Sequence, residues 1–553
     1  MKNIIYIVFA GLILVGCSDS FLETENKNTL DVGSFFKTEN DIKLAVNAAY
    51  TPLAGGGMFG LKYTYNMNTL DPFIWLDKPT TGFDKMIFDT NTFNLVWQYL
   101  YFGLYRTSDI LANIDRVKGV DTERMNQYKG QLRALRGMYY FYLVTWFNSP
   151  IYYDETNIPS NPLQGLKNGT PEQFWSKLEE DLTYASENLP DEWSNADADL
   201  GRITRGAANA QLGKALLYKH YHYYLRFGKG TSTESSANLL KAKNAFKQVI
   251  ESSKYQLTLP ATKSKADYQA ALLANFSFID IPTTNKVYKA ENNLESVWEI
   301  QYNADTRGQS NYYLPGMWTG GNMLQSYFSP QPNSFRNHEI DPSLWYEFET
   351  VTAHPSGYER DPRAYATCYL EGDSMDWRPE SPYYHKSFQA KLNVFTTVLD
   401  NNLYQGPTPS KAIGIKKGYY PQYTTGVLEV APNNFRLIRY ADVLLMYAEA
   451  CLQLNSDADG TGLIALNQVR QRVDMPHVIA LTPEAIMHER NVELATEGHR
   501  YNDIIRWSFD PKFNINLDIL FKGNFNVEKN FYFPIPQNEI NKNKGALKQN
   551  AGW

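Results

Sequence analysis

The chain has 553 residues, of which 43% are hydrophobic and 14% aromatic, so it can form a large buried core. Its 53 basic and 59 acidic residues give a formal net charge of −6. This balance argues against a general nucleic-acid binder, because such proteins need an excess of basic groups to displace counterions from phosphates. The aromatic content and the lack of long like-charged blocks argue against a disordered chain.

The N-terminal segment predicts export and lipid attachment. Residues 4–15 form an apolar stretch of 12 residues, which is too short for a permanent bilayer-spanning helix of about 20 residues. The stretch runs into Gly16 and Cys17, an ending that resembles a bacterial lipobox, in which the cysteine becomes the acylated first residue. We therefore expect residues 1–16 to be a lipoprotein signal peptide, Cys17 to carry the lipid, and residues 17–38 to form a tether. The alternative is an ordinary secretory signal with an incidental cysteine.

The remaining cysteines predict neither disulfides nor a metal site. With Cys17 lipidated, only Cys368 and Cys451 remain, too few for a disulfide framework in an exported chain of this length. The sequence has no Cys and His spacing typical of metal ligands. We expect no metal and no cofactor.

Hydrophobic periodicity predicts a mostly helical protein. A first helix over 40–53 is expected to end at three consecutive glycines. The strongest helical patterns then follow in three blocks: 94–117 with 122–147; 171–189, 204–227 and 237–252; and 435–454, 460–473 and 483–495.

Small and large apolar residues alternate between neighbouring predicted helices. Ala208, Leu212 and Ala215 on one helix are followed by Ala242 and Phe246 on the next, close to the 34-residue period of tetratricopeptide repeats. The repeats are dispersed and degenerate, so they predict a tetratricopeptide-like helical scaffold with insertions rather than a regular solenoid.

Long insertions separate the helical blocks. Segments 66–92, 254–346 and 401–434 are rich in Pro, Gly, Asn and Tyr. Loops of this length inside a compact protein are uncommon and are often functional. We expect irregular loops and minor β-hairpins there to carry a ligand site. The predicted organisation is an N-terminal helical region over 39–253, loop-rich ligand-binding insertions over 254–434, and a C-terminal helical region over 435–553.

Several dispersed motifs follow one another in a specific order. They are the lipobox with residues 17–22, the helical segment 128–136, the segments 439–450 and 466–472, the charged positions between 489 and 507, and the C-terminal segments 533–540 and 549–553. Together they resemble the SusD/RagB family of nutrient-binding outer-membrane lipoproteins, over essentially the whole chain. Ala551 is a small departure, since proline is common there.

The resemblance implies a function and partners. Proteins of this family sit as a hinged lid on a SusC-like TonB-dependent outer-membrane transporter, facing the cell exterior. They capture oligosaccharides or polysaccharides without catalysis and release them for import. Capture of peptides or another nutrient in the same complex is the alternative, and a surface glycoside hydrolase is a third. No nucleic acid is expected as a partner.

Two segments offer the chemistry that binds a sugar. Aromatic rings cover the C–H face of a sugar ring, while polar side chains bind its hydroxyls. The predicted aromatic platforms are Trp75, Tyr312, Tyr313 and Trp318, and the predicted polar partners are Asn68, Asp71, Arg307 and Asn311. For each ring, packing on the scaffold is the alternative. For Trp97, Trp146, Trp175 and Trp507, which lie on helical segments, we expect core packing.

A catalytic site is not indicated. Glu489, Glu493 and Glu497 have helical spacing, but a structural ion-pair network with nearby arginines explains them more simply; those arginines are Arg490, Arg500 and Arg506. His488 and Glu489 are not followed by the second histidine of a zinc helix. No G-x-S-x-G nucleophile elbow is present.

Overall fold

The computed structural model describes most of the chain after the N-terminal segment. The described residues are 35–76, 86–160, 165–195, 197–277, 279–303, 320–328, 338–370, 372–373, 413–417, 431–454 and 457–553. Cys17 and the predicted signal peptide therefore lie outside them. No helix within these ranges combines the length and apolarity needed to cross a membrane.

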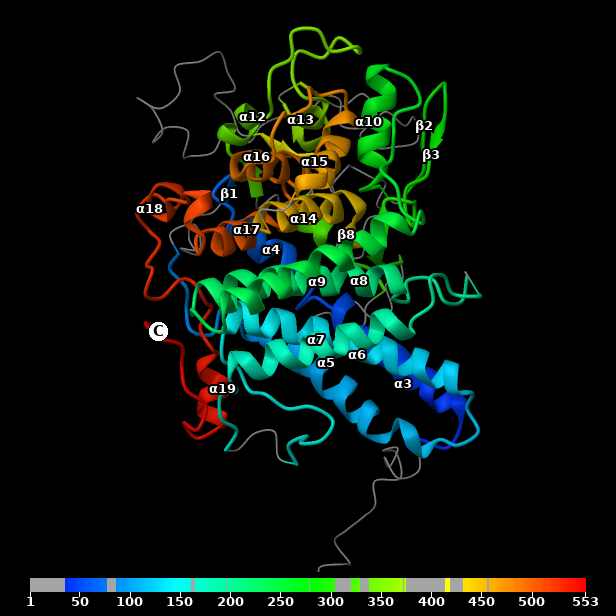
Figure 1. The fold of residues 1–553 in the computed structure, drawn as a ribbon, viewed down its shortest axis with the longest axis vertical. Helices are drawn as coiled ribbons and strands as arrows, with labels where there is room; N and C mark the ends of the chain where they lie inside the picture. The colour runs from blue at the N-terminus through cyan, green and yellow to red at the C-terminus, as the bar shows by residue number, and fades with distance from the viewer. Residues whose placement is uncertain are drawn as a thin grey trace, which may run out of the picture.

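Most of the N-terminal helices pack against one another, whereas the second of them packs mainly against a helix of the C-terminal region. These helices are α3 Glu39–Ala54, α4 Lys62–Thr69, α5 Asn94–Asn113, α6 Thr122–Phe147, α7 Pro171–Asn188, α8 Arg205–Lys219 and α9 Ser232–Glu251. In Figure 1, α5 to α9 form adjoining rows. Capping boxes begin α3, α7 and α9, each with a threonine as the N-cap, so local hydrogen bonds fix where these helices start.

Glycines allow the helices to approach closely. A Cβ on Gly103 of α5 would overlap the ring of Tyr139 on α6, and one on Gly213 of α8 would overlap the ring of Phe246 on α9. This small-against-large packing agrees with the tetratricopeptide-like scaffold predicted from the sequence.

Most of the C-terminal helices lie on the other side of α8 and α9, whereas the last of them lies at the lower left, near the earlier N-terminal helices (Figure 1). The C-terminal helices are α14 Tyr440–Gln453, α15 Thr461–Gln471, α16 Pro483–Glu493, α17 Arg500–Trp507, α18 Leu517–Leu520 and α19 Gln537–Lys542. One apolar core contains residues from Phe36 to Leu547 and so includes both helical regions. Trp97, Trp146, Trp175 and Trp507 are all buried in it, as predicted.

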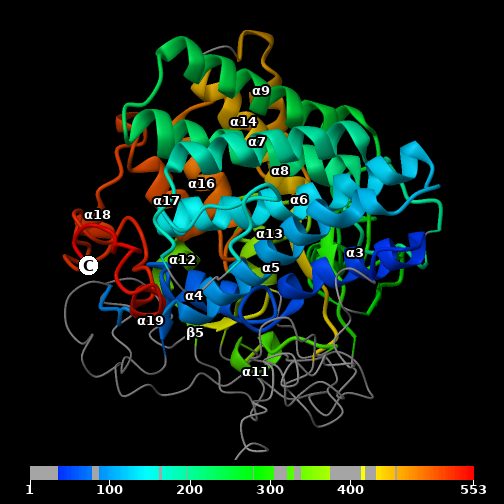
Figure 2. The same ribbon diagram turned by 90° about the horizontal axis from the view of Figure 1, so that it is seen from below.

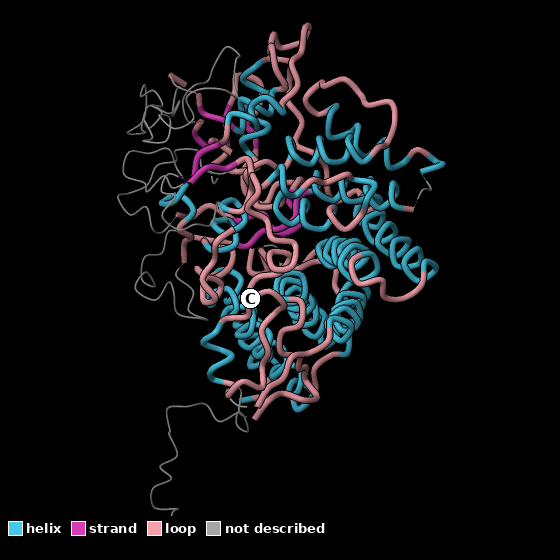
Figure 3. The backbone as a smooth tube through the Cα atoms, turned by 90° about the vertical axis from the view of Figure 1, so that its left-hand side faces the viewer, coloured by secondary structure: helices cyan, strands magenta, loops and turns pink. Residues whose placement is uncertain are grey.

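The strands are short and pair antiparallel. The pairs are β1 Ile74–Leu76 with β5 His338–Ile340, β2 Ile281–Pro282 with β3 Val287–Tyr288, β4 Ser296–Ile300 with β8 Phe435–Arg439, and β6 Cys368–Tyr369 with β7 Gly414–Ile415. The pair β2–β3 is a hairpin, whereas the other three pairs join segments distant in sequence. The short strands lie beside the helical layers (Figure 3).

Several predicted boundaries are wrong; the helix predicted over 237–252, for example, is α9, which begins five residues earlier at Ser232. The helix predicted over 435–454 begins only at Tyr440, because residues 435–439 pair with β4. The insertion expected over 66–92 begins inside α4, and the one over 254–346 includes three helices: α10 Lys265–Ala274, α11 Leu324–Phe328 and α12 Pro342–Glu347. A further short helix, α13 Pro362–Thr367, precedes β6.

Candidate functional site

Four short strands form a platform at one end of the molecule. The β1–β5 pair continues through the bridge between Ile340 and Ile413 to β7 and its partner β6. Beneath this strand platform, Leu61, Ile74, Phe328 and other apolar residues form a separate small core. Figure 2 shows β5 and α11 at the opposite end of the molecule from α9.

Next to the platform, residues of the first predicted binding segment lie close to residues that follow the second one in sequence. The amide of Met323 donates to the carbonyl of Gly60 at 3.0 Å, and the rings of Tyr65 and Tyr327 meet edge to face at 5.6 Å. Asn303 and Gly320, which flank segment 304–319, are adjacent, because the amide of Asn303 donates to the carbonyl of Gly320 at 2.6 Å. Arg307, Asn311, Tyr312, Tyr313 and Trp318 lie outside the described residues, so their roles stay predictions.

Asn68 lies inside the protein rather than on its surface. It is fully buried on α4, and its side-chain amide donates to the carbonyl of Thr496 at 3.0 Å. This bond holds α4 against the segment after α16. Trp75 lies on β1, where its backbone pairs with Glu339. Its side chain is not among the parts of the chain that the structure describes. Ligand contact by either residue stays a prediction.

Asp71 is buried beside Arg500, an arginine that the sequence analysis placed in the ion-pair network of the nearby glutamates. Its Oδ1 accepts from the amide of Phe73 at 2.9 Å and lies 3.9 Å from Nε of Arg500. The Arg500 guanidinium lies 4.1 Å from the centre of the Phe73 ring. Burial raises the pKa of Asp71 to about 6, although Arg500 opposes the shift. Ligand contact by Asp71 is likewise untested.

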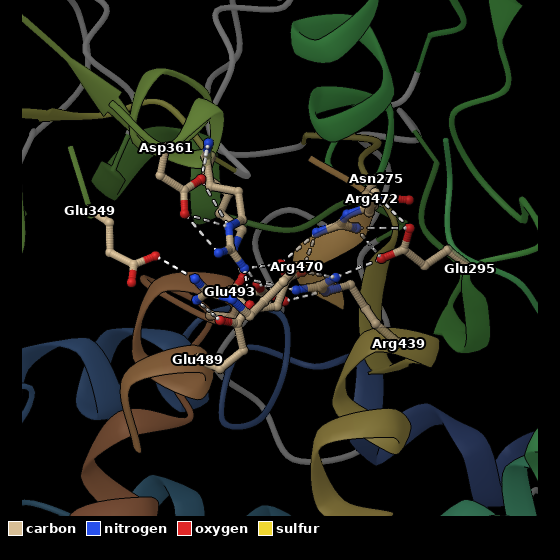
Figure 4. Close-up of polar contacts among 12 residues, drawn as sticks. Asn275, Glu295, Glu349, Asp361, Arg439, Arg470, Arg472, Glu489 and Glu493 are labelled. Atoms are coloured by element: carbon tan, nitrogen blue, oxygen red, sulfur yellow. Dashed lines mark hydrogen bonds and ion pairs between the residues drawn. The ribbon is translucent and has the colours of Figure 1, made fainter. Parts of the chain in front are cut away.

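The carboxylates that raised the hydrolase alternative are paired deep in the protein (Figure 4). Glu493 accepts from Arg363, Arg439 and Arg472. Burial alone would raise the pKa of Glu493, but these arginines outweigh it and hold that pKa well below its usual range. Such a group remains an ionised acceptor and is unsuited to proton transfer near neutral pH.

The predicted ion-pair network is confirmed, but its partners differ from those expected. Glu489 pairs with Arg363 and Arg470, and Glu497 with Arg439 and Lys417. The arginines nearest in sequence serve other groups: Arg490 pairs with Asp442 and Asp503, and Arg506 with Glu449 and Asp503. The part of the chain that the structure describes contains no cluster of His, Cys, Asp and Glu suited to hold a metal ion.

Family models match both parts of the chain. Residues 294–553 match the model described as the SusD family, and residues 20–225 match one described as starch-binding, associating with the outer membrane. The chain belongs to the SusD family.

Relatives of this SusD-family protein align over nearly its whole length. SusD-like protein P25 of Formosa agariphila is 23% identical, with 100% of this chain and 98% of the relative covered. A SusD-like protein of Bacteroides ovatus is 24% identical, with 92% and 82% covered.

Solved structures share the fold of the SusD-family chain. A protein described as a laminarin-binding SusD-like protein has a TM-score of 0.66 at 21% identity, with 94% of this chain and all of that chain covered. Surface glycan-binding protein A of Bacteroides thetaiotaomicron, in complex with laminarihexaose, has a TM-score of 0.66 at 21% identity, with 93% and 100% covered. At this identity the likeness establishes the tetratricopeptide-like SusD fold.

Sequence reasoning missed a polar cavity beside the platform of this SusD-family protein. Its walls include Thr64, Gln325, Asn433 and Thr496. These are common residue types on four separate segments, and no motif connects them. Only the fold brings them together.

Proposed function

We propose that this protein is a non-catalytic cell-surface lipoprotein that captures an oligosaccharide or polysaccharide and delivers it to a SusC-like TonB-dependent transporter. The observation that carries the proposal is the match of both halves of the chain to SusD-family models. Similar solved structures described as binding laminarin or laminarihexaose support a glycan as the ligand.

The strand platform supports the placement of the ligand site. Near it, the residues that flank segment 304–319 are hydrogen-bonded to each other, and Tyr327 contacts Tyr65 of the first predicted binding segment. The proposed site combines aromatic and polar side chains of these two segments, as binding of a sugar chain requires.

The family description supports an outer-membrane location. The lipobox ending in Cys17 supplies the expected anchor, and several acyl chains attached there would hold the protein firmly, since each buried methylene contributes about 0.8 kcal/mol. The predicted orientation faces the cell exterior.

Native affinity gels containing one polysaccharide each test glycan capture. We expect retardation in at least one gel, and we expect Trp75→Ala or Trp318→Ala to weaken that binding by about 1–3 kcal/mol, as for an aromatic platform that loses one stacked ring. The unfolding midpoint should barely move in either variant. Free migration in every gel, together with binding to a peptide mixture, would show that the nutrient is not a glycan.

Co-purification tests delivery to a transporter. Tagged full-length protein extracted from outer membranes in mild detergent should elute with a TonB-dependent transporter. The matched control is the Cys17→Ala variant. It should elute without the transporter if the lipid holds the two proteins in one membrane. Elution of the wild-type protein alone would contradict the delivery role.

A further inference from the structure

A partly open cavity lies where six chain segments meet beside the strand platform. Thr64 of α4, Gln325 of α11 and Thr496 after α16 contribute to its walls, together with Asn433 before β8 and Phe276 after α10. The space open to the centres of water molecules is about 60 Å³. At about 10–15 Å³ for each water centre and about 30 Å³ of liquid volume per water, this equals roughly four to six waters, or about 120–180 Å³ of ligand.

The cavity walls carry buried polar atoms that lack a hydrogen-bond partner within the described structure. They are Oγ1 of Thr64 and Thr496 and both amide atoms of Gln325 and of Asn433. All four residues are at least nine-tenths buried. Buried polar groups are nearly always hydrogen-bonded, because an unpaired one destabilises the fold. The four side chains that carry these six unpaired atoms all contribute to the walls of one small cavity, so a rotation of the side chains toward the cavity would let an occupant supply the missing partners.

The charged groups on the walls are already neutralised. Lys417 lies 2.5 Å from Glu497, and Arg436 lies 3.0 Å from Glu299. The groups left to bind an occupant are therefore neutral amides and hydroxyls, which both donate and accept. An anionic or cationic ligand would find no unpaired counter-charge among the described wall residues.

Apolar surface completes the lining. Phe276 and Phe435 both contribute to the walls and are half-buried. A neutral sugar residue has this pairing of properties, with hydroxyls that donate and accept and C–H faces that pack on rings. The volume suits one residue rather than a longer chain.

We propose that this cavity is a binding subsite for one uncharged sugar residue, at the end or a single-residue branch of the captured glycan. This inference rests on the proposed glycan-capture function. It adds that the protein recognises a terminal residue by burying it, through Gln325 and Asn433, in addition to contacts along the chain.

Isothermal titration calorimetry with single sugars tests the subsite. The probes are glucose, galactose, mannose, xylose and, as an acidic comparison, glucuronic acid. We expect the full-length protein to bind at least one neutral sugar, and Gln325→Leu or Asn433→Leu to weaken binding about tenfold or more, since a buried hydrogen-bonding partner is lost. The unfolding temperature should stay the same or rise, because leucine removes an unpaired buried amide. Asn541→Leu, an exposed amide on α19, is the control for binding.

The outcomes separate this inference from the proposed function. If a polysaccharide is retained equally by wild-type protein and both leucine variants, or if no single sugar binds, the subsite is overturned while glycan capture stands. If the leucine variants lower the unfolding temperature and bind sugar normally, the cavity holds only structural water, and the subsite is again overturned. If a single sugar binds in the cavity but no polysaccharide is retained, the subsite stands and polysaccharide capture fails. If a leucine variant does not fold, Thr496→Val is measured in its place, with the same expected loss of sugar binding.

Discussion

Replacing Glu493 with glutamine should weaken the fold, because this buried carboxylate pairs with three arginines in the network of Figure 4. Its carboxylate lies 3.0 Å from Nη1 of Arg439 and 2.5 Å from Nη2 of Arg472, and it also accepts from Arg363. Removing one partner of a buried ion pair costs about 3–5 kcal/mol. Arg472 keeps Glu295, and the other two arginines also keep carboxylates, so we expect the lower part of that range, about 3–4 kcal/mol.

Urea unfolding followed by tryptophan fluorescence at pH 7 measures this loss. Glu528→Gln is the matched control, because Glu528 is exposed and has no ion pair in the described structure. A surface change of this kind should stay within about 0.5 kcal/mol of the wild-type protein. Equal unfolding midpoints for Glu493→Gln and Glu528→Gln would refute the argument that the charge of Glu493 stabilises the fold.

The same variant predicts how the effect depends on pH. The folded protein holds the pKa of Glu493 below its unfolded value, since the arginines outweigh the effect of burial. The stabilisation is therefore fully present above the unfolded pKa of about 4.3 and is lost as the pH falls toward the folded pKa. The difference between wild-type and Glu493→Gln midpoints should be constant from pH 7 to 5 and should shrink from pH 4 to 3. A difference that does not shrink there would contradict this account.

Three further changes have separate readouts. Cys17→Ala should release the protein from the membrane fraction of cells that lack the transporter, and retention there would mean that the N-terminal segment is misread. Trp97→Ala should lower the free energy of unfolding by about 3–5 kcal/mol, because Trp97 is only 2% exposed in the core; an unchanged urea midpoint would contradict this. Gly103→Ala should cost about 1–3 kcal/mol by overpacking, because the new Cβ would overlap the ring of Tyr139, whose hydroxyl donates to the carbonyl of Ala49 at 3.1 Å. Differential scanning calorimetry measures that loss, and an unfolding temperature equal to the wild type would show that the ring can move.

Local signals explain why the helical scaffold could be predicted from the sequence. Helix α6 spans Thr122–Phe147 as expected, because Asp121 caps its start and Asn148, with a φ of 59°, ends it. The strand β8 could not be predicted in the same way. The apolar pattern of residues 435–439 favours the start of a helix. These residues are extended only because they pair with Ser296–Ile300, which is far away in sequence.

The candidate site shows the same division between local and long-range information. The charge spacing at Glu489 and Glu493 correctly indicated an ion-pair network, but the partners Arg363 and Arg439 come from distant segments that no local pattern connects to them. The cavity beside the platform depends entirely on such long-range contacts. The side chains predicted to bind a glycan are mostly on segments outside the described residues, so they remain predictions from residue chemistry.

The hydrogen bond between Asn303 and Gly320 has a consequence for how such proteins diversify. The scaffold already brings the two ends of segment 304–319 together, so the folding cost of that segment depends only weakly on its length. Each doubling of a closed loop adds only about 0.6 kcal/mol of closure entropy. Insertions, deletions or grafted sequences between Asn303 and Gly320 should therefore leave the stability of the helical layers nearly unchanged, so the scaffold tolerates wide variation in the length of this segment.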